Sequence, residues 1–210
     1  MINNILPIAK EGWGHILFSV LAFAIFSILD LDFLGFFSFL AILIFLFVYR
    51  NPERITPIFE DNSVVSPVDG VVLSIEEIDD SEYLYKVVVN SDYLHVSVLR
   101  VPITSSLKSF KLLIGARLSR YNELSKKLNE NSELIFEDKN SNKVKITHVL
   151  KLSFDSIKIS ATESQKCQQG ARYGVMPNGL TTIYLPQNFR LNIKVGNEII
   201  GSQTLIGYFS

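Results

Sequence analysis

The chain has 210 residues and a mass of 23.7 kDa, which suits one domain with an appended segment. Its formal net charge of −1 excludes the strongly basic surface of a nucleic-acid-binding protein, so we expect no nucleic-acid partner. Its single cysteine, Cys167, excludes an internal disulfide and is typical of a reducing compartment.

The most hydrophobic part of the chain lies near the N-terminus, where residues 16–29 and 33–49 form two uncharged runs. A membrane-spanning helix needs about 20 apolar residues; the second run reaches this range, and the first does so when Trp13 is included. Asp30 and Asp32 separate the runs, and a turn outside the bilayer spares both carboxylates the cost of burial in lipid. We therefore predict a transmembrane helical hairpin.

Positively charged residues flank this hairpin, with Lys10 before it and Arg50 and Arg54 after it. Because such flanks mark the cytoplasmic side, we predict a protein of the cytoplasmic (inner) membrane whose C-terminal domain faces the cytoplasm. One alternative is a cleaved signal peptide, which the length of the apolar region and the lack of a small-residue cleavage pattern disfavour. The other is a hairpin buried in the core of a soluble protein.

The composition changes to that of an ordinary globular domain after the hairpin, so we predict a membrane hairpin over residues 1–50 and a β-rich domain over residues 51–210. The fold class is mainly β, a sandwich or flattened barrel, with one helical segment near residues 118–128. Short β-branched runs between turn residues predict strands at 64–65, 71–73, 85–89, 95–101, 143–146, 156–159, 181–185, 191–195 and 198–200. Residues 103–117 are expected to form a loop.

A series of short motifs runs along nearly the whole chain. They are Tyr49-Arg50-Asn51-Pro52-Glu53-Arg54, Ser66-Pro67-Val68-Asp69-Gly70, Val98-Leu99-Arg100-Val101-Pro102, Asn129-Glu130, residues 170–179, Tyr184-Leu185-Pro186, and the closing Val195-Gly196 and Gly201 with Thr204. In this order they resemble the short, membrane-anchored form of the phosphatidylserine decarboxylase family. The resemblance implies a pyruvoyl enzyme that makes phosphatidylethanolamine and carbon dioxide from phosphatidylserine.

The resemblance breaks down at the processing junction. In the family, a serine after a glycine attacks the preceding carbonyl, and elimination then leaves a pyruvoyl group that binds the substrate amine. With Gly179 aligned to that glycine, the serine position is Leu180, whose side chain neither attacks nor leaves. Pro177 and Asn178 predict a rebuilt Asn-Gly turn here. The two threonines that follow would have to move into the leucine position to form a ketobutyryl group. We expect no cofactor, and a pyruvoyl group only if the chain processes itself.

The resemblance also implies a histidine and an aspartate that support processing. Aligned on Arg100, the histidine position is Ser97, while His95 lies two residues earlier on the same face of the predicted strand. His95 is a catalytic candidate, with a half-buried strand residue as the alternative. Asp69 matches the aspartate, although a turn in which it bonds its own backbone is the alternative. Arg100 is a candidate for binding a lipid phosphate or carboxylate, or else forms an ion pair.

Three functions from different classes remain open. The missing nucleophile favours a pseudoenzyme of this family that binds lipid or regulates an active relative. The alternatives are an active decarboxylase that uses a non-standard residue, and a membrane-anchored β-domain with an unrelated binding role. The expected partners are the lipid bilayer, phosphatidylserine or a related phospholipid, and either a second copy in a homodimer or an active homologue. No histidine pattern predicts a metal site.

Overall fold

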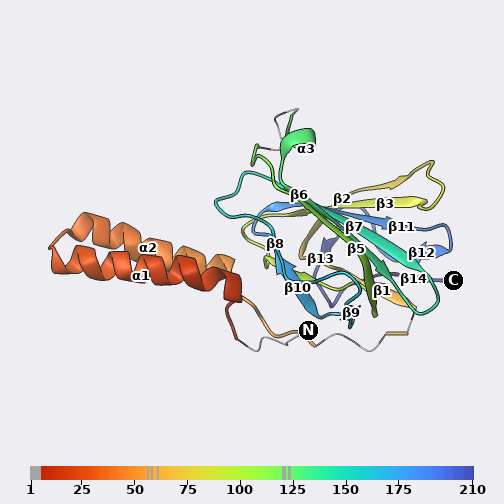
Figure 1. The fold of residues 1–210 in the computed structure, drawn as a ribbon, viewed down its shortest axis with the longest axis horizontal. Helices are drawn as coiled ribbons and strands as arrows, with labels where there is room; N and C mark the ends of the chain where they lie inside the picture. The colour runs from red at the N-terminus through yellow and green to blue at the C-terminus, as the bar shows by residue number, and fades with distance from the viewer. Residues whose placement is uncertain (1–5, 56, 58, 61, 120–121, 123) are drawn as a thin grey trace. The chain divides into compact units, whose positions relative to one another are not determined.

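The computed structural model describes residues 6–55, 57, 59–60, 62–119, 122 and 124–210 of the chain. The chain divides into two compact units between Glu53 and Arg54. Helices make up the N-terminal unit and strands most of the second, as Figure 1 shows. Each unit is described by itself below.

The N-terminal unit is a helical hairpin. A short 3-10 turn, η1 (Lys10–Gly12), leads into α1 (Trp13–Ile28), and α2 (Asp32–Val48) returns alongside it. Asp30, between the helices, has a φ of 52°, in the left-handed region that non-glycine residues rarely adopt outside turns. Both aspartates that separate the apolar runs therefore lie at the turn between the helices, as the sequence predicts.

Hydrogen bonds join the two ends of this hairpin. The Ala9 N–H donates to the Tyr49 carbonyl at 2.8 Å, and the Asn51 N–H donates to the Pro7 carbonyl at 2.7 Å. The Asn51 side chain also donates to the Leu6 carbonyl at 2.8 Å. The chain consequently enters and leaves the hairpin at the same end.

Most apolar side chains of the hairpin are exposed. The segment Lys10–Ile28 is long and apolar enough to cross a membrane and is only 17% buried, whereas Asp32–Val48 is shorter. The first helix begins at Trp13, the residue that the sequence analysis counts toward its spanning length, and η1 adds a turn before it; the second has 17 residues. The low burial is unlike that of a helix in the core of a soluble protein, which packs on most sides.

The second unit is mostly β. Its elements are β1 (Ser63–Val65), β2 (Gly70–Glu77), β3 (Tyr85–Ser91), β4 (Val98–Arg100), β5 (Ser105–Leu113), α3 (Ser125–Leu128), β6 (Asn131–Glu137), β7 (Lys143–Leu150), β8 (Lys158–Ile159), β9 (Lys166–Cys167), β10 (Arg172–Val175), β11 (Gly179–Leu185), β12 (Phe189–Leu191), β13 (Glu198–Ile199) and β14 (Leu205–Phe209). An eight-stranded sheet has the order β13-β2-β3-β11-β7-β6-β5-β9, and two three-stranded sheets have the orders β1-β14-β12 and β4-β10-β8. The prediction of a mainly β domain after two apolar helices is confirmed; the sandwich or flattened barrel stays a prediction.

The core lies against the inner face of the large sheet. Burial alternates along β6, β7 and β11, as expected for strands with one face on a core. Phe136, Ile146 and Ile183 of these strands are fully buried, and each contributes about 1.5–3 kcal/mol by leaving water. Tyr173 of β10 packs its ring on Phe136, with centroids 5.6 Å apart.

Several predicted elements differ from the observed ones. Residues 103–117 are not a loop, because they contain β5, which pairs with β6 along its whole length. Among the described residues between 118 and 128, only Ser125–Leu128 is helical, and Tyr121 of the predicted helical stripe lies outside them. At residues 105–113, strand pairing with a distant segment overrides the local pattern. The strands predicted at 95–101 and 191–195 are shorter or end earlier, as β4 and β12.

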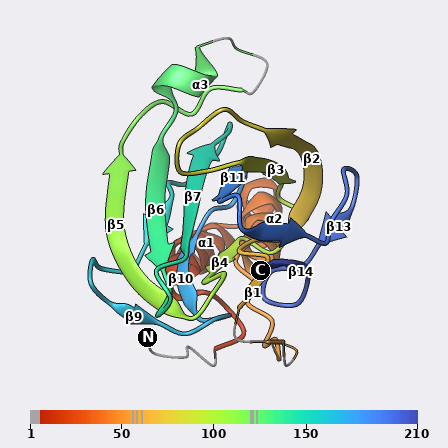
Figure 2. The ribbon, with the colours of Figure 1, turned by 90° about the vertical axis from the view of Figure 1, so that its right-hand side faces the viewer.

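The register of the large sheet brings several strand termini to one end. Leu113 pairs with Asn131, which pairs with Val149, which pairs with Leu180, which pairs with Asn90. We call this row and the loops beyond it the junction end; Figure 2 shows α3 there, beyond the ends of β5 and β6. The connections after β2, β6 and β11 lie at the opposite end of the strands.

Candidate processing site

The processing junction predicted from the sequence lies at the start of a strand. Gly179 and Leu180 are the first two residues of β11, and Gly179 lies between Ser91 of β3 and Leu150 of β7. Alternation along the strand buries Gly179 toward the core and leaves Leu180 half-buried on the outer face. The backbone at the junction is therefore held from both sides by neighbouring strands.

Glycine is required at position 179 by close packing. A Cβ added there would overlap the sulfur of Met176 and lie 2.8 Å from the Val149 carbonyl oxygen. The bend of the chain lies at Pro177 and Asn178, and Gly179 already belongs to the strand. The expected Asn-Gly turn is therefore wrong, because pairing with β3 and β7 keeps the glycine extended.

Ser97, the position that the resemblance assigns to histidine, lies beside the junction. The Met176 N–H donates to the Ser97 carbonyl at 2.8 Å, and Met176 packs directly on Gly179. Ser97 is buried, with 4% of its surface exposed. Met176 thus links Ser97 to Gly179, the residue before Leu180.

His95 is not part of a strand. It lies in a turn between β3 and β4, and its N–H donates to the Asp92 carbonyl at 3.0 Å. Its Nδ1 is 2.8 Å from a carboxylate oxygen of Asp92. The prediction of a half-buried strand residue is wrong in its secondary structure, because β4 begins only at Val98.

Asp69 is held by an arginine rather than by its own turn. Both guanidinium nitrogens of Arg54 bond its carboxylate, one to Oδ1 and the other to Oδ2 at 2.6 Å. The Gly201 N–H also donates to Oδ1, at 2.8 Å. The local turn is closed instead by Ser66, whose hydroxyl bonds the Val68 backbone. The expectation that Asp69 bonds its own backbone is therefore wrong.

The backbone of Asp69 nevertheless reaches the junction. The Ser91 hydroxyl donates to the Asp69 carbonyl at 2.5 Å, and Ser91 lies directly opposite Gly179. Asp69 and the junction are thus neighbours through one serine, while the carboxylate stays paired with Arg54.

Three arginines gather near this carboxylate. Arg100 is 4% exposed and donates to the Gly170 carbonyl at 3.1 Å, and it lies opposite Arg172 in the β4–β10 pairing. Burial and the like charges of Arg172 and Arg54 lower the pKa of Arg100 to about 10, and Asp69 opposes this shift. Guanidinium groups bind carboxylates and phosphates with two parallel hydrogen bonds, so such a cluster suits an anionic group.

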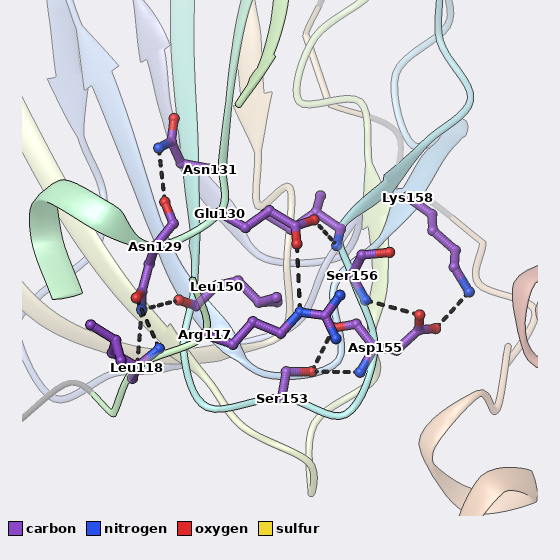
Figure 3. A network of polar contacts seen from close by, with 11 residues as sticks. Arg117, Leu118, Asn129, Glu130, Asn131, Leu150, Ser153, Asp155, Ser156 and Lys158 are labelled. Carbon is purple, nitrogen blue, oxygen red and sulfur yellow. Dashed lines mark hydrogen bonds and ion pairs between the residues drawn. The ribbon is translucent and has the colours of Figure 1, made fainter. Parts of the chain in front are cut away.

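The Asn129-Glu130 motif organises the loops at the junction end. Figure 3 shows the Asn129 side chain bonded to two separate segments. Its amide donates to the carbonyls of Leu118 and Leu150, at 2.8 and 2.7 Å, and its oxygen accepts the Leu118 N–H at 2.9 Å. Since Leu150 pairs with Gly179, this asparagine links the loop after β5 to the strand beside the junction.

Glu130 makes the second half of this network. Its carboxylate accepts the Ile157 N–H at 2.7 Å and lies 3.6 Å from Nε of Arg117. Close by, Lys158 donates to Asp155 at 2.6 Å (Figure 3). The network joins the loop after β5 to the loop after β7, so both are held in place beside the junction.

A buried histidine that the sequence did not single out lies next to the junction. His148 of β7 is fully buried; its Nδ1 is 2.8 Å from the Thr181 hydroxyl and its Nε2 2.7 Å from the Tyr173 hydroxyl. Burial lowers the pKa of His148 to about 3, so the imidazole is neutral at neutral pH. Burial also raises the pKa of Tyr173 far above its usual value. The alternation of apolar residues along β7 was the one sequence feature that pointed His148 inward.

Comparison with known proteins agrees with these motifs. Residues 42–207 match the family described as phosphatidylserine decarboxylase. The chain is 30% identical over 214 residues to the phosphatidylserine decarboxylase proenzyme of Ehrlichia chaffeensis, across 99% of this chain and 94% of that one. The proenzymes of Geotalea uraniireducens and Geobacter metallireducens are 29% and 30% identical, over 99% of both chains in each case. This chain therefore belongs to the phosphatidylserine decarboxylase family.

Proposed function

We propose that this protein is a membrane-anchored pseudoenzyme of phospholipid metabolism, which does not process itself and binds a phospholipid headgroup. The observation that carries the proposal is the hydrocarbon side chain of Leu180 at the position that the resemblance assigns to the cleaving serine. Pyruvoyl formation needs a side-chain nucleophile that later departs, and leucine offers neither property. The residues at the junction therefore do not fit the formation of a pyruvoyl group.

The neighbouring hydroxyl does not replace the missing one. Thr181 faces the core, on the opposite side of β11 from Leu180, and its hydroxyl lies against His148. Moving Thr181 into the leucine position would shift the strand by one residue, and such a shift turns every side chain to the other face. Ile183 and Leu185 would then leave the core, which opposes the shift strongly.

The aspartate and histidine that the resemblance assigns to processing are also unsuited to that role here. Asp69 accepts three hydrogen bonds from Arg54 and Gly201, so its carboxylate is occupied in an ion pair. Ser97 carries no imidazole. His95, the nearest histidine in sequence, is bonded to Asp92 in a turn. These contacts support a structural role for Asp69 over a catalytic one.

Headgroup binding is supported by the arginine cluster. Arg172 is half-buried and lies opposite the buried Arg100, so it is the member that a ligand reaches more easily. A phosphatidylserine headgroup has a phosphate and a carboxylate, and both suit guanidinium groups. The cluster is formed by residues from the motifs shared with the family, including Arg54.

Membrane anchoring is supported by the hairpin. Its apolar side chains are mostly exposed, and its two ends are hydrogen-bonded together. Lys10 and Arg50 lie at that end and favour the cytoplasmic side. We propose residues 1–50 as the anchor and residues 51–210 as the cytoplasmic domain.

The first experiment measures the mass of the purified full chain. We expect one species of 23.7 kDa that does not react with carbonyl reagents. Cleavage after Gly179 would instead release a C-terminal fragment of 31 residues, since 210 − 179 = 31. A fragment with a carbonyl at its N-terminus would overturn the proposal and favour an active decarboxylase.

The Leu180→Ser variant tests whether the hydroxyl alone restores cleavage, and we expect that it does not, because Ser97 and Asp69 supply no base.

The second experiment measures lipid binding. Isothermal titration of the detergent-solubilised chain with a short-chain phosphatidylserine should give saturable heat, and short-chain phosphatidylcholine should bind more weakly. Arg172→Gln should weaken phosphatidylserine binding at least tenfold, because it removes a bidentate partner worth about 1.5–3 kcal/mol. Arg190→Gln, at an exposed position of β12, is the matched control. Equal, weak binding of both lipids would favour an unrelated role for the β unit.

A further inference from the structure

Exposed apolar side chains gather at the junction end of the large sheet. We call this set the apolar rim; its members are Leu94, Leu113, Ile114, Leu124, Leu128, Leu152 and Phe154. Ile114 is 89% exposed, Leu94 73% and Leu152 64%, and residues 112–114 are three consecutive exposed apolar residues. A surface of this kind is unfavourable in water unless another phase or molecule covers it.

The rim is one surface because specific contacts hold its loops together. The Ala116 N–H donates to the Leu128 carbonyl at 2.7 Å, and the Glu130 N–H donates to the Ala116 carbonyl at 2.9 Å. These bonds fix the segment after β5 alongside α3. The loop after β7 is joined to them by the Asn129-Glu130 network of Figure 3.

The turn that carries Leu94 is fixed to the same surface. The ring of Tyr93 stacks on that of Phe154, with centroids 5.6 Å apart and an interplanar angle of 11°. The Tyr93 hydroxyl donates to the Leu152 carbonyl at 3.3 Å. Three loops from different parts of the chain therefore present their apolar residues together.

The two ends of the sheet differ in chemistry. The connections at the far end carry acidic and polar residues, among them Asp79, Asp80, Glu82, Asp138 and Asn140. Around the rim, Lys111 and Lys127 are exposed, whereas Lys158 is half-buried and paired with Asp155. An apolar surface bordered by lysines is the pattern of a segment that enters an anionic membrane interface.

The chain itself keeps a membrane within reach of the rim. Only 14 residues, numbered 49–62, separate the end of α2 from the start of β1. Even fully extended they span about 50 Å. A hairpin anchored in a bilayer therefore raises the effective concentration of lipid surface near the β unit, and a rim of modest intrinsic affinity suffices for docking.

We propose that the apolar rim docks the β unit onto an anionic bilayer, with its leucine, isoleucine and phenylalanine side chains in the headgroup–acyl boundary. The inference rests on the proposed membrane anchoring and adds an orientation to it. Docking places the Leu180 end of β11 against the lipid surface and the acidic connections away from it. A junction at the bilayer surface can contact headgroups while the lipids stay in the membrane.

The test uses the full chain in nanodiscs with one tryptophan as reporter. The chain has one tryptophan, Trp13, so Trp13→Phe removes the background. Ile114→Trp and Phe154→Trp then report from two different loops of the rim, and Asn140→Trp is the matched control at the far end. Nanodiscs contain phosphatidylcholine with phosphatidylglycerol, with and without bromine on the acyl chains, because bromine quenches tryptophan at short range.

Docking predicts that bromolipid quenches both rim reporters and shifts their emission to shorter wavelength, while Asn140→Trp keeps its emission. Adding Leu113→Asp to the Phe154→Trp protein should reduce its quenching, because both residues belong to one surface and a charge at Leu113 weakens the docking of that whole surface. Phosphatidylcholine alone should give weaker quenching than the anionic mixture.

Rim reporters that bromolipid leaves unquenched would overturn the proposal. If iodide in the buffer also fails to quench them, a second copy or another protein covers the rim instead. The mass of the same sample reports self-processing independently. A processed chain would refute the proposed pseudoenzyme function and leave the docking proposal unaffected. Loss of the chain from the nanodisc refutes the anchor itself.

Discussion

The buried His148 makes the stability of the β unit depend on pH in a way that one substitution removes. The imidazole has hydroxyl partners on both nitrogens, Thr181 and Tyr173, and burial lowers its pKa to about 3. In the unfolded chain the same side chain has a pKa of about 6.5. Below pH 6.5 the unfolded chain therefore binds a proton that the folded chain refuses, and acid favours unfolding.

The magnitude follows from the two pKa values. Each pH unit between them changes the free energy of unfolding by up to about 1.4 kcal/mol. Lowering the pH from 6.5 to 4.5 should thus cost about 2.5 kcal/mol from His148 alone, whereas above pH 6.5 no stability is lost through this group. His148→Gln removes the titration; it should lower stability at pH 7 by about 1–3 kcal/mol through imperfect hydrogen bonds, yet flatten the acid dependence.

Urea unfolding of the full chain in detergent measures this difference. Near-ultraviolet circular dichroism reports on packed tyrosines such as Tyr173, so it follows the β unit. His95→Gln is the matched control, because it removes an imidazole from a turn outside the core. Equal loss of stability on acidification in the wild type and in His148→Gln would refute the reasoning.

Three further substitutions test the contacts around the junction. Arg54→Ala leaves a buried carboxylate without its cation; it should cost about 3 kcal/mol, lowering the melting temperature by about 6–12 °C in a thermal scan. An unchanged melting temperature would show that this ion pair is not structural. Gly179→Ala should cost about 1–3 kcal/mol in urea unfolding because its Cβ meets Met176 and a strand carbonyl, whereas the half-exposed Leu180→Ala should cost less. The reverse order would contradict the observed facing of β11. Asn129→Ala removes three hydrogen bonds, so amide exchange at Leu118 should quicken; unchanged protection there would refute the asparagine's role.

The residues around the junction form one connected set of contacts. Ser91, Asp69 and Gly179 remain linked through hydrogen bonding and strand pairing, and Ser97 stays adjacent through Met176. Close packing against Met176 and the Val149 carbonyl accounts for the glycine at position 179. These contacts are consistent with the binding role that we propose.

The sequence by itself determined the features that depend on local composition and on single side chains. Two uncharged runs predict the two helices, because the length and apolar composition of a run are local properties of the sequence. The ordered motifs predict the family, and the absence of a hydroxyl at Leu180 is a property of that residue alone. Short β-branched runs between turn residues likewise predicted the first half of β7 and most of β11.

Tertiary structure alone decided which groups meet. Asp69 accepts a hydrogen bond from Gly201, 132 residues away, and no local pattern predicts that pairing. The strand β5 was missed because serines and lysines interrupt its apolar residues, and pairing with β6 stabilises it regardless. The burial of His148 and the apolar rim arise in the same way: register between distant strands sets which side chains share a core and which share a surface.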